Sequence, residues 1–361
     1  MTMAIRVLVA EDSLTVRKRL VEVLGEDPEL KVVGEAADGK QAIELCQRLR
    51  PDVVTLDMMM PVMTGVAAAE YIMAYCPTPI LVVSASTNRG ELFRTYDALA
   101  AGAIDVLDKP TRGEPDGAWE ARLRSAVKLI SRIKVITHPR AKLALAAPAG
   151  PRPASPGGAV PDRSTPARLV AIGGSTGSPA AVVDILRALP PEFPAPILLV
   201  IHINEPFGAA FAEWLDGQSG LRVRYPVDGE PLWREGGGRV LMAPPGKHLV
   251  LRGGALRIVG GPERHSCIPS VDVLFESIAL EAGRETVACL LTGMGRDGAL
   301  GLQAIRRAGG ATIAQDEATS AVFGMPREAI LLGGAEQVLP LPQIASALVA
   351  AIGGRGGQGA R

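Results

Sequence analysis

The stretch Arg168–Pro179, RLVAIGGSTGSP, decides the prediction for the second half of this chain. It begins with the apolar, β-prone run Arg168–Ile172 and continues through Gly173–Gly177 into a helical pattern over Ala180–Leu189. This order predicts a strand, a glycine-rich turn and a helix, which place the Ser175 hydroxyl at the carboxyl end of a strand. Free N–H groups at the helix start can bind a developing negative charge there. The alternative is a serine that only caps the helix.

Length and composition indicate a globular protein of about two domains. The chain has 361 residues, of which 47% are hydrophobic and 21% charged, as in ordinary folded domains. Lys+Arg and Asp+Glu both number 38, and this balance argues against nucleic-acid binding through a basic surface. There is no signal-peptide pattern and no apolar run of membrane-spanning length, so we expect a cytoplasmic protein without membrane insertion. We also expect a monomer. The four cysteines lack CxxC spacing and are expected to be buried thiols.

The first part of the chain alternates strand-like and helix-like runs. Such alternation predicts a parallel, doubly wound α/β sheet that binds its ligands beyond the carboxyl ends of the strands. The expected strands are Ile5–Ala10, Lys31–Glu35, Asp52–Asp57, Pro79–Ala85 and Asp105–Leu107. The expected helices are Ser13–Leu24, Lys40–Leu49, Val66–Tyr75, Glu91–Ala100 and Trp119–Ile136.

Polar residues stand at the carboxyl ends of these expected strands. Glu11 and Asp12 follow the first strand, Asp57 ends the third, Ser84 lies in the fourth, and Lys109 follows the fifth. Three carboxylates at one edge would repel one another unless a hard cation such as Mg²⁺ lay between them. The lysine and the hydroxyl would then bind a phosphoryl group carried by one carboxylate. Separate structural roles, such as Asp12 capping the first helix, are the alternative.

This arrangement resembles the receiver domain of two-component response regulators, over roughly residues 4–136. The resemblance implies a five-stranded, flavodoxin-like sheet and a histidine kinase as phosphodonor. It also implies roles for five residues: Asp57 as phosphorylation site, Glu11 and Asp12 as Mg²⁺ ligands with Asp57, Ser84 as switch hydroxyl, and Lys109 as charge partner. Val106 stands where the family often has an aromatic residue whose rotation reports phosphorylation, which leaves that part of the switch open.

A stretch rich in Pro, Ala and Gly separates the two halves of the chain. It has no hydrophobic period and cannot bury enough apolar surface to offset its ordering entropy, so a flexible tether is expected. The expected boundaries are 1–136 for the receiver, 137–167 for the linker, 168–352 for a catalytic domain and 353–361 for a disordered tail. The linker is either a hinge for domain motion or a passive spacer.

The second domain is expected to be another doubly wound α/β fold, because strand-like and helix-like runs again alternate. The expected strands are Arg168–Ile172, Pro196–Ile201, Arg222–Val227, Val240–Ala243, Leu249–Leu251, Leu256–Val259, Thr286–Leu291 and Thr312–Gln315. The expected helices are Ala180–Leu189, Phe207–Leu215, Val271–Ala282 and Ala299–Arg307.

A serine, a histidine and an aspartate end strands of this second domain. His202 follows the buried run Pro196–Ile201, and no other histidine of the chain has such a position. Asp297 lies in a glycine turn after another apolar strand, and Asp316 is its rival as the acid. If the strands are neighbours, the histidine can deprotonate Ser175 while the aspartate holds its tautomer. Glycines on both sides of the Met294–Asp297 turn permit a close approach of the backbone, and this favours Asp297 as the acid.

Backbone N–H groups near Thr176 and Met294 are the expected oxyanion donors. The second domain also contains the runs GGSTGS, TGMGRDGA, GGATIAQDEATSAVFGMP and PSVDVLFESIA. Through these runs it resembles a known family, the catalytic domain of chemotaxis protein-glutamate methylesterases, over about Arg168–Ile352. The resemblance implies the triad Ser175, His202 and Asp297, acting without a metal or other cofactor.

The substrates that this resemblance implies are γ-glutamyl methyl esters on methyl-accepting chemoreceptors, with deamidation of glutamines as a second activity. Ile201, Asn204 and Glu205 depart from the family pattern around the histidine. The expected function is therefore a phosphorylation-activated hydrolase of chemotactic adaptation. The alternative is a docking module with an inactive hydrolase domain, whereas a DNA-binding output is disfavoured by the neutral charge and the long α/β pattern.

Overall fold

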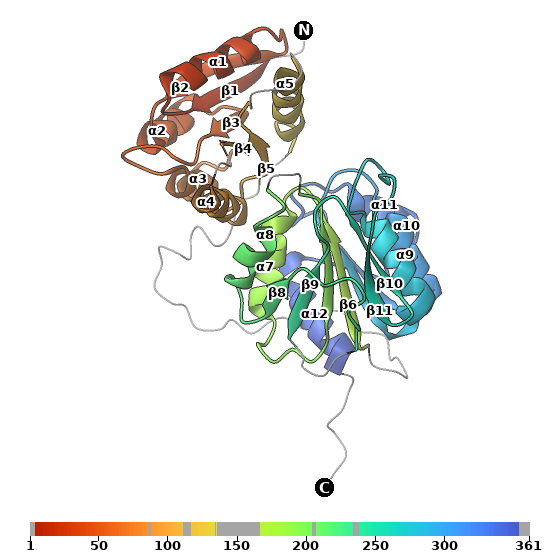
Figure 1. Cartoon of the computed structure of the whole chain (residues 1–361). Helices are drawn as coiled ribbons and strands as arrows, with labels where there is room; N and C mark the ends of the chain where they lie inside the picture. The colour runs from red at the N-terminus through yellow and green to blue at the C-terminus, as the bar shows by residue number, and fades with distance from the viewer. Residues whose placement is uncertain are drawn as a thin grey trace. The chain divides into compact units, whose positions relative to one another are not determined.

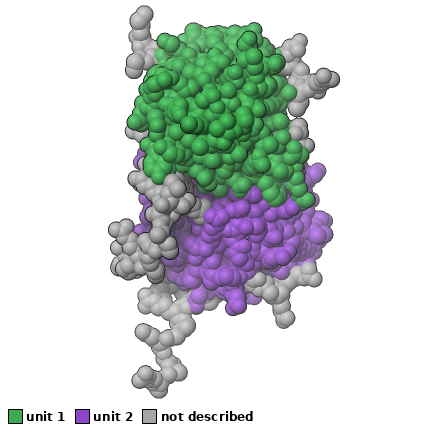
Figure 2. Space-filling view, turned by 90° about the vertical axis from the view of Figure 1, so that its left-hand side faces the viewer, with its two compact units in different colours: residues 1–152 green, residues 153–361 purple. Residues whose placement is uncertain are grey.

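The computed structural model describes residues 4–85, 88–110, 117–133, 135, 167–203, 207–233 and 238–353. The chain divides into two compact units, Met1–Arg152 and Pro153–Arg361 (Figure 1), which Figure 2 shows in separate colours. The expected linker, apart from Ala167, and the expected tail, apart from Gly353, lie outside the described residues. The domain boundaries therefore remain predictions.

The first unit contains a five-stranded parallel sheet in the order β2-β1-β3-β4-β5. Its strands are β1 (Ile5–Ala10), β2 (Leu30–Ala36), β3 (Val53–Leu56), β4 (Ile80–Ser84) and β5 (Asp105–Asp108). Its helices are α1 (Leu14–Gly25), α2 (Gly39–Leu49), α3 (Gly65–Tyr75), α4 (Arg89–Ala100) and α5 (Ala118–Ile130). This architecture confirms the predicted doubly wound fold.

The last helix of this unit is shorter than the expected Trp119–Ile136. Helix α5 ends at Ile130, and the backbone N–H groups of Arg132 and Ile133 bond to carbonyl oxygens three residues earlier. The Ser131 hydroxyl also donates to the Lys128 carbonyl oxygen at 2.8 Å. These bonds satisfy the last carbonyl groups in a tightened turn, so the helix does not continue through residues 131–133, whereas residues 134 and 136 of the expected helix lie outside the described ranges.

The second unit is built on a seven-stranded parallel sheet in the order β14-β13-β12-β6-β7-β9-β8. Its strands are β6 (Leu169–Gly174), β7 (Ile197–Ile201), β8 (Arg222–Arg224), β9 (Arg239–Met242), β12 (Thr286–Leu290), β13 (Ala311–Gln315) and β14 (Gln337–Leu339). Its helices are α7 (Ser178–Ala188), α8 (Phe211–Asp216), α9 (Val271–Ala282), the short 3₁₀ helix η1 (Gly283–Glu285), α10 (Ala299–Arg307), α11 (Met325–Leu331) and α12 (Leu341–Gly353). Helices cover both faces: α7 packs with α12, and α9 packs with α10, which in turn packs with α11 (Figure 1).

Several local expectations for this unit need correction. The strands β10 (His248–Arg252) and β11 (Ala255–Val259) form a separate antiparallel hairpin outside the main sheet, and Ala255 of β11 also forms an isolated antiparallel bridge with Pro231. The expected strand Arg222–Val227 ends at Arg224, and the expected helix Phe207–Leu215 begins only at Phe211. Elements α11, β14 and α12 were not expected.

The central strands are continuous apolar runs because both faces of the sheet are covered. Every residue of β6, β7 and β12 is buried. From β6 the chain extends the sheet in one direction through β7 and in the other through β12, which makes this the topological switch point where such sheets bind ligands. Within the described ranges, no helix is long and apolar enough to cross a membrane.

Helices α9 and α10 approach each other closely at Gly301. A Cβ atom at this position would lie 2.5 Å from the Phe275 Cβ atom and 3.2 Å from the Asp272 Cα atom. Phe275 is fully buried in the core, so neither neighbour can move away without disturbing its packing.

We expect Gly301→Ala to lower the free energy of unfolding of the second unit by about 1–3 kcal/mol, the usual cost of overpacking a core. Urea denaturation of the full chain, followed by circular dichroism, measures this change. Gly260→Ala is the control, because the nearest atom to its Cβ would be the Lys247 Nζ atom at 3.7 Å. Equal stability of the two variants would contradict the close-packing argument.

Candidate active site

Ser175 follows β6 directly and is tied to both neighbouring strands. Its N–H donates to the Thr292 carbonyl oxygen beyond β12 at 3.0 Å. On the other side, the His202 N–H donates to the Gly174 carbonyl oxygen at 3.1 Å. Three adjacent strand ends therefore meet at the serine, as the sequence analysis required if β6, β7 and β12 were neighbours.

The glycine after Thr292 allows the turn beyond β12 to approach Ser175. A Cβ atom at Gly293 would lie 2.8 Å from the Ser175 Cβ atom and 3.0 Å from its nitrogen, so only glycine fits there. The Thr292 hydroxyl donates to the Thr176 carbonyl oxygen at 3.0 Å and accepts from the Val322 N–H at 2.9 Å. These bonds fix the serine turn against two other loops.

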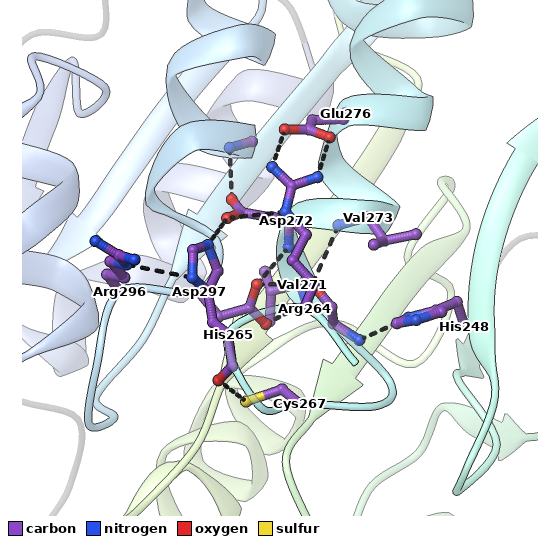
Figure 3. A network of polar contacts seen from close by, with 12 residues as sticks. His248, Arg264, His265, Cys267, Val271, Asp272, Val273, Glu276, Arg296 and Asp297 are labelled. Carbon is purple, nitrogen blue, oxygen red and sulfur yellow. Dashed lines mark hydrogen bonds and ion pairs between the residues drawn. The ribbon is translucent and has the colours of Figure 1, made fainter. Parts of the chain in front are cut away.

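The Asp297 carboxylate lies at the N-terminus of α9 and contacts the imidazole of His202. The distance from His202 Nε2 to Asp297 Oδ2 is 2.8 Å. The same carboxylate accepts hydrogen bonds from the Ser270 hydroxyl at 2.7 Å and from the N–H groups of Val271 at 2.7 Å and Asp272 at 3.1 Å. The helix N-terminus, which favours negative charge, thus stabilises the buried carboxylate in its ionised form (Figure 3).

The titration of the two groups reflects this contact. Burial acts to raise the pKa of Asp297, but hydrogen bonds from His202 and Ser270 outweigh burial and hold that pKa below its ordinary value. Burial acts to lower the pKa of His202, but hydrogen bonds with Asp297 and Cys267 outweigh it and raise the pKa to about 9. Because Nε2 faces the carboxylate, Nδ1 is the nitrogen that can take or give a proton during a reaction.

Asp316, the rival acid, lies in a different network. Its Oδ1 atom accepts hydrogen bonds from the N–H of Thr319 at 2.9 Å and from the Thr319 hydroxyl at 2.6 Å. The structure thus brings Asp297, and not Asp316, into hydrogen-bond contact with His202. His138 lies outside the described residues.

The other two described histidines have structural partners. The Nδ1 atom of His248 accepts from the N–H of Ser270 at 3.1 Å, which assigns its proton to Nε2. The Nε2 atom of His265 lies 3.2 Å from an oxygen of Asp272. Neither histidine contacts Ser175 or Asp297 through a hydrogen bond within the described residues.

The serine hydroxyl itself makes no hydrogen bond to His202 in this structure, although both residues are described. The Nδ1 atom of His202 instead lies 3.5 Å from the Sγ atom of Cys267. Nucleophile–base contacts are often long or misaligned without substrate, so this geometry is compatible with a catalytic pair. The N–H groups of Thr176 and Met294 donate to no other described residue, as oxyanion donors would require.

Sequence reasoning missed three residues that support this site: Ser270, Cys267 and Gln315. Ser270 precedes a helical run and was recognisable as an N-cap, but no local signal indicates that its hydroxyl contacts Asp297. The Gln315 Oε1 atom accepts from the Thr292 N–H at 2.8 Å, also across the sheet.

Of the three residues that depart from the family pattern around the histidine, Ile201 is the last residue of β7, whereas residues 204 and 205 lie outside the described ranges.

The first unit brings its predicted residues together at the carboxyl edge of its sheet. The Nζ atom of Lys109 lies 2.9 Å from Glu11 Oε2 and 3.1 Å from Asp57 Oδ1. Oxygen atoms of Glu11, Asp12 and Asp57 all lie within 4.8 Å of one another. Ser84 ends the neighbouring strand β4, and its carbonyl oxygen accepts from the Lys109 N–H at 2.9 Å.

Burial strongly affects the charges at this edge. Desolvation raises the pKa of both Glu11 and Asp57, despite the nearby lysine. Desolvation acts to lower the pKa of Lys109, but the charges of the two carboxylates outweigh it and raise that pKa. Two buried carboxylates and the exposed Asp12 carry more negative charge than one lysine neutralises, and the all-oxygen donor set suits Mg²⁺.

Two further groups of possible metal ligands share Asp297, namely His202–Cys267–Asp297 and His265–Asp272–Asp297. The hydrogen bonds to the Asp297 oxygens already account for both groupings. We therefore assign neither of them to a metal.

The comparisons with known proteins agree with this geometry. The CheB methylesterase family model matches residues 170–348, and the response regulator receiver domain model matches residues 7–115. A protein-glutamate methylesterase/protein-glutamine glutaminase of Anaeromyxobacter dehalogenans is 46% identical over 344 residues, which cover 95% of this chain and 96% of that protein. The chain belongs to the CheB methylesterase family.

Other members of this family are similar over their full length. A protein with the same name from Pseudomonas aeruginosa is 41% identical over 360 residues, which cover 98% of this chain and 99% of that protein. Among solved structures, the CheB methylesterase catalytic domain of Thermotoga maritima is 36% identical, covers 51% of this chain and 98% of its own, and has a TM-score of 0.48. The response regulator domain of Thermotoga maritima CheB is 34% identical, covers 36% of this chain and 98% of its own, and has a TM-score of 0.33.

We expect Asp297→Asn to reduce kcat for ester hydrolysis by about 10⁴-fold, because the amide no longer holds His202 in the tautomer with Nδ1 as base. The base must be neutral, so kcat/KM rises as the pH passes upward through the pKa of His202. Since Asp297 raises that pKa, the rising limb should move to lower pH in the variant. A pH profile of kcat/KM measures both effects.

Asp316→Asn is the matched control, because that carboxylate contacts Thr319 and not the imidazole. It should keep both the rate and the pH profile. A loss of rate in Asp316→Asn equal to that in Asp297→Asn would contradict the assignment of the acid.

Proposed function

We propose that this chain is a phosphorylation-activated protein-glutamate methylesterase that also deamidates protein glutamines. The observation that carries the proposal is the 2.8 Å contact between His202 and Asp297 beside Ser175, at the switch point of the sheet. The names of full-length relatives support the substrate class. Methyl-accepting chemoreceptors are the proposed substrates, and chemotactic adaptation is the proposed outcome.

In the proposed reaction, the Ser175 hydroxyl attacks the carbonyl carbon of a glutamyl methyl ester. His202 takes the hydroxyl proton at Nδ1, and Asp297 stabilises the resulting imidazolium through Nε2. The N–H groups of Thr176 and Met294 bind the oxyanion of the tetrahedral intermediate. His202 then gives its proton to the leaving methanol, and water hydrolyses the glutamyl-enzyme with the same base. Glutamine follows the same path with ammonia as the leaving group.

The first unit is the proposed receiver of a phosphoryl group from a histidine kinase. Asp57 is the proposed acceptor, with Mg²⁺ held by Asp57, Glu11 and Asp12. When bound, the cation supplies positive charge to the phosphoryl oxygens. Lys109, already within 3.1 Å of Asp57, contributes a second positive charge, and the Ser84 hydroxyl donates a hydrogen bond to the phosphoryl group.

The proposed domains are 1–136 for the receiver, 137–167 for the linker and 168–352 for the catalytic domain, followed by the tail 353–361. In this scheme the unphosphorylated receiver restrains the catalytic domain, and phosphorylation releases it. A coupling free energy of about 1–3 kcal/mol is sufficient for such control.

We expect Ser175→Ala to lower methanol release from methylated chemoreceptor membranes by about 10⁴-fold or more, because no other hydroxyl replaces the nucleophile. A small-molecule phosphodonor should raise release by the wild-type chain but not by Asp57→Ala, which lacks the acceptor. The measurement is the rate of methanol release with and without the donor. Ser346→Ala is the control, since that hydroxyl bonds to the Gln343 carbonyl oxygen on α12.

Each half of the proposal fails separately in this experiment. Unchanged release by Ser175→Ala would contradict the nucleophile. An equal response of Asp57→Ala to the donor would contradict the acceptor. If the wild-type chain released no methanol under either condition, a docking role without hydrolysis would replace the esterase.

We expect chelation of Mg²⁺ to abolish phosphate incorporation into the chain while leaving basal methanol release unchanged, because only the receiver site uses the cation. Asp12→Asn should also weaken incorporation, since it removes one of three carboxylates within 4.8 Å of one another. Glu44→Gln, an exposed acid on α2, is the matched control. Incorporation that persists at full rate after chelation would refute the Mg²⁺ assignment.

A further inference from the structure

One cysteine of this chain lies beside the proposed catalytic histidine and has no part in the proposed reaction. Cys46, Cys76 and Cys289 are buried, whereas Cys267 is partly exposed. The expectation that all four thiols are buried is therefore wrong for Cys267. Its Sγ atom lies 3.5 Å from His202 Nδ1, the nitrogen that must accept the serine proton.

A strained turn holds this cysteine in place. Arg264 and Cys267 exchange two backbone hydrogen bonds of 3.1 and 3.0 Å, and the two residues between them have positive φ angles, 52° at His265 and 60° at Ser266. Tight turns of this kind normally use Gly or Asn, because a side chain is disfavoured in the left-handed region. Such strain persists only where the surroundings fix the backbone, and it concentrates at functional sites.

The surroundings do fix this turn through a polar network. The guanidinium of Arg264 forms two bonds to the Glu276 carboxylate, of 2.5 and 2.6 Å. The imidazole of His265 lies between the Asp272 carboxylate at 3.2 Å and the Nε of Arg296 at 3.2 Å (Figure 3). The turn is thereby anchored on α9 and on the loop before α10, which supports a fixed position for Cys267.

The contacts place the thiol in a second nucleophile–base–acid series on the same histidine. Cys267 Sγ faces His202 Nδ1, while Nε2 of the same ring lies 2.8 Å from Asp297. A histidine oriented by a carboxylate can remove the proton from a thiol as it removes one from a serine hydroxyl. The carbonyl oxygen of His265, 3.3 Å from Sγ, is the other acceptor within reach.

We propose that Cys267 is a modification site that reacts with small disulfides and thereby blocks the active site. The sulfur of Cys267 attacks one sulfur of the disulfide while its proton passes to His202 Nδ1. The disulfide S–S bond breaks, a new S–S bond forms at Cys267, and the leaving thiolate takes the proton from His202. One S–S bond breaks and one S–S bond forms, so the disulfide itself is the only oxidant that the exchange requires.

The block follows from the position of the modified side chain. The added group would lie against Nδ1, where the serine proton must arrive, so the proposed esterase reaction loses its base. This consequence rests on the proposed function, whereas the thiol reaction does not. The other three cysteines are shielded, with exposed fractions of 0% for Cys46, 1% for Cys76 and 0% for Cys289.

The first arm of the test measures the thiol alone. The full-length chain is treated with glutathione disulfide, and intact mass is followed over time. We expect one rapid addition, its absence in Cys267→Ser and its retention in Cys289→Ser. In His202→Gln, which keeps a side chain of similar size, addition should be about 10²-fold slower, the lower bound for a positioned general base.

The second arm measures methanol release by the same samples. The modified wild-type chain should release methanol at least about 10²-fold more slowly than before treatment, because a positioned general base contributes at least that much, and dithiothreitol should restore the rate. Cys267→Ser should keep its own untreated rate after the same treatment. Rapid addition in Cys267→Ser, an undiminished rate of addition in His202→Gln, or modification without loss of methanol release would each overturn the proposal. Absence of methanol release before treatment would count against the esterase alone.

Discussion

The candidate active site depends on a buried carboxylate whose hydrogen-bond partners are protein groups in place of water. Asp297 receives hydrogen bonds from the N-terminus of α9, from the Ser270 hydroxyl and from His202. A buried carboxylate without such partners would take up a proton and lose its hold on the imidazole. Because one oxygen of the carboxylate faces both the helix and the histidine, the position of α9 and the orientation of the proposed base are fixed together.

The order of parallel strands performs the same task in both units. In each sheet, the carboxyl ends of adjacent strands bring polar residues from distant parts of the sequence to one edge. The two edges differ in the groups that stabilise their buried carboxylates. In the first unit, Lys109 partly neutralises Glu11 and Asp57 and leaves negative charge for a cation. In the second, the helix N-terminus stabilises one carboxylate, whose remaining interaction orients a histidine.

The strained turn between Arg264 and Cys267 is linked to the same carboxylate through its neighbours. Asp272 accepts from Gly301 at 2.7 Å and from His265 at 3.2 Å, while its own N–H donates to Asp297 at 3.1 Å. The turn that carries the thiol and the acid that orients the imidazole are thus held by one helix start. This arrangement explains how a side chain outside the proposed reaction lies against Nδ1, the histidine atom that the proposed reaction uses.

The sequence by itself determined the fold class and most central elements, because strands buried on both faces are continuous apolar runs and end in glycine turns. It also singled out Ser175 and His202, which follow such strands directly. It favoured Asp297 over Asp316 through the flanking glycines and the family resemblance, but both residues follow buried strands, and only the strand order and the start of α9 show which carboxylate contacts the imidazole. The separate hairpin β10–β11 and the contact of Cys267 with the imidazole were likewise decided by the tertiary structure. Cys267 and His202 lie far apart in sequence, and no local pattern records which distant surface a side chain meets. The two hairpin strands are adjacent in sequence, but their local pattern does not show that they stay outside the main sheet.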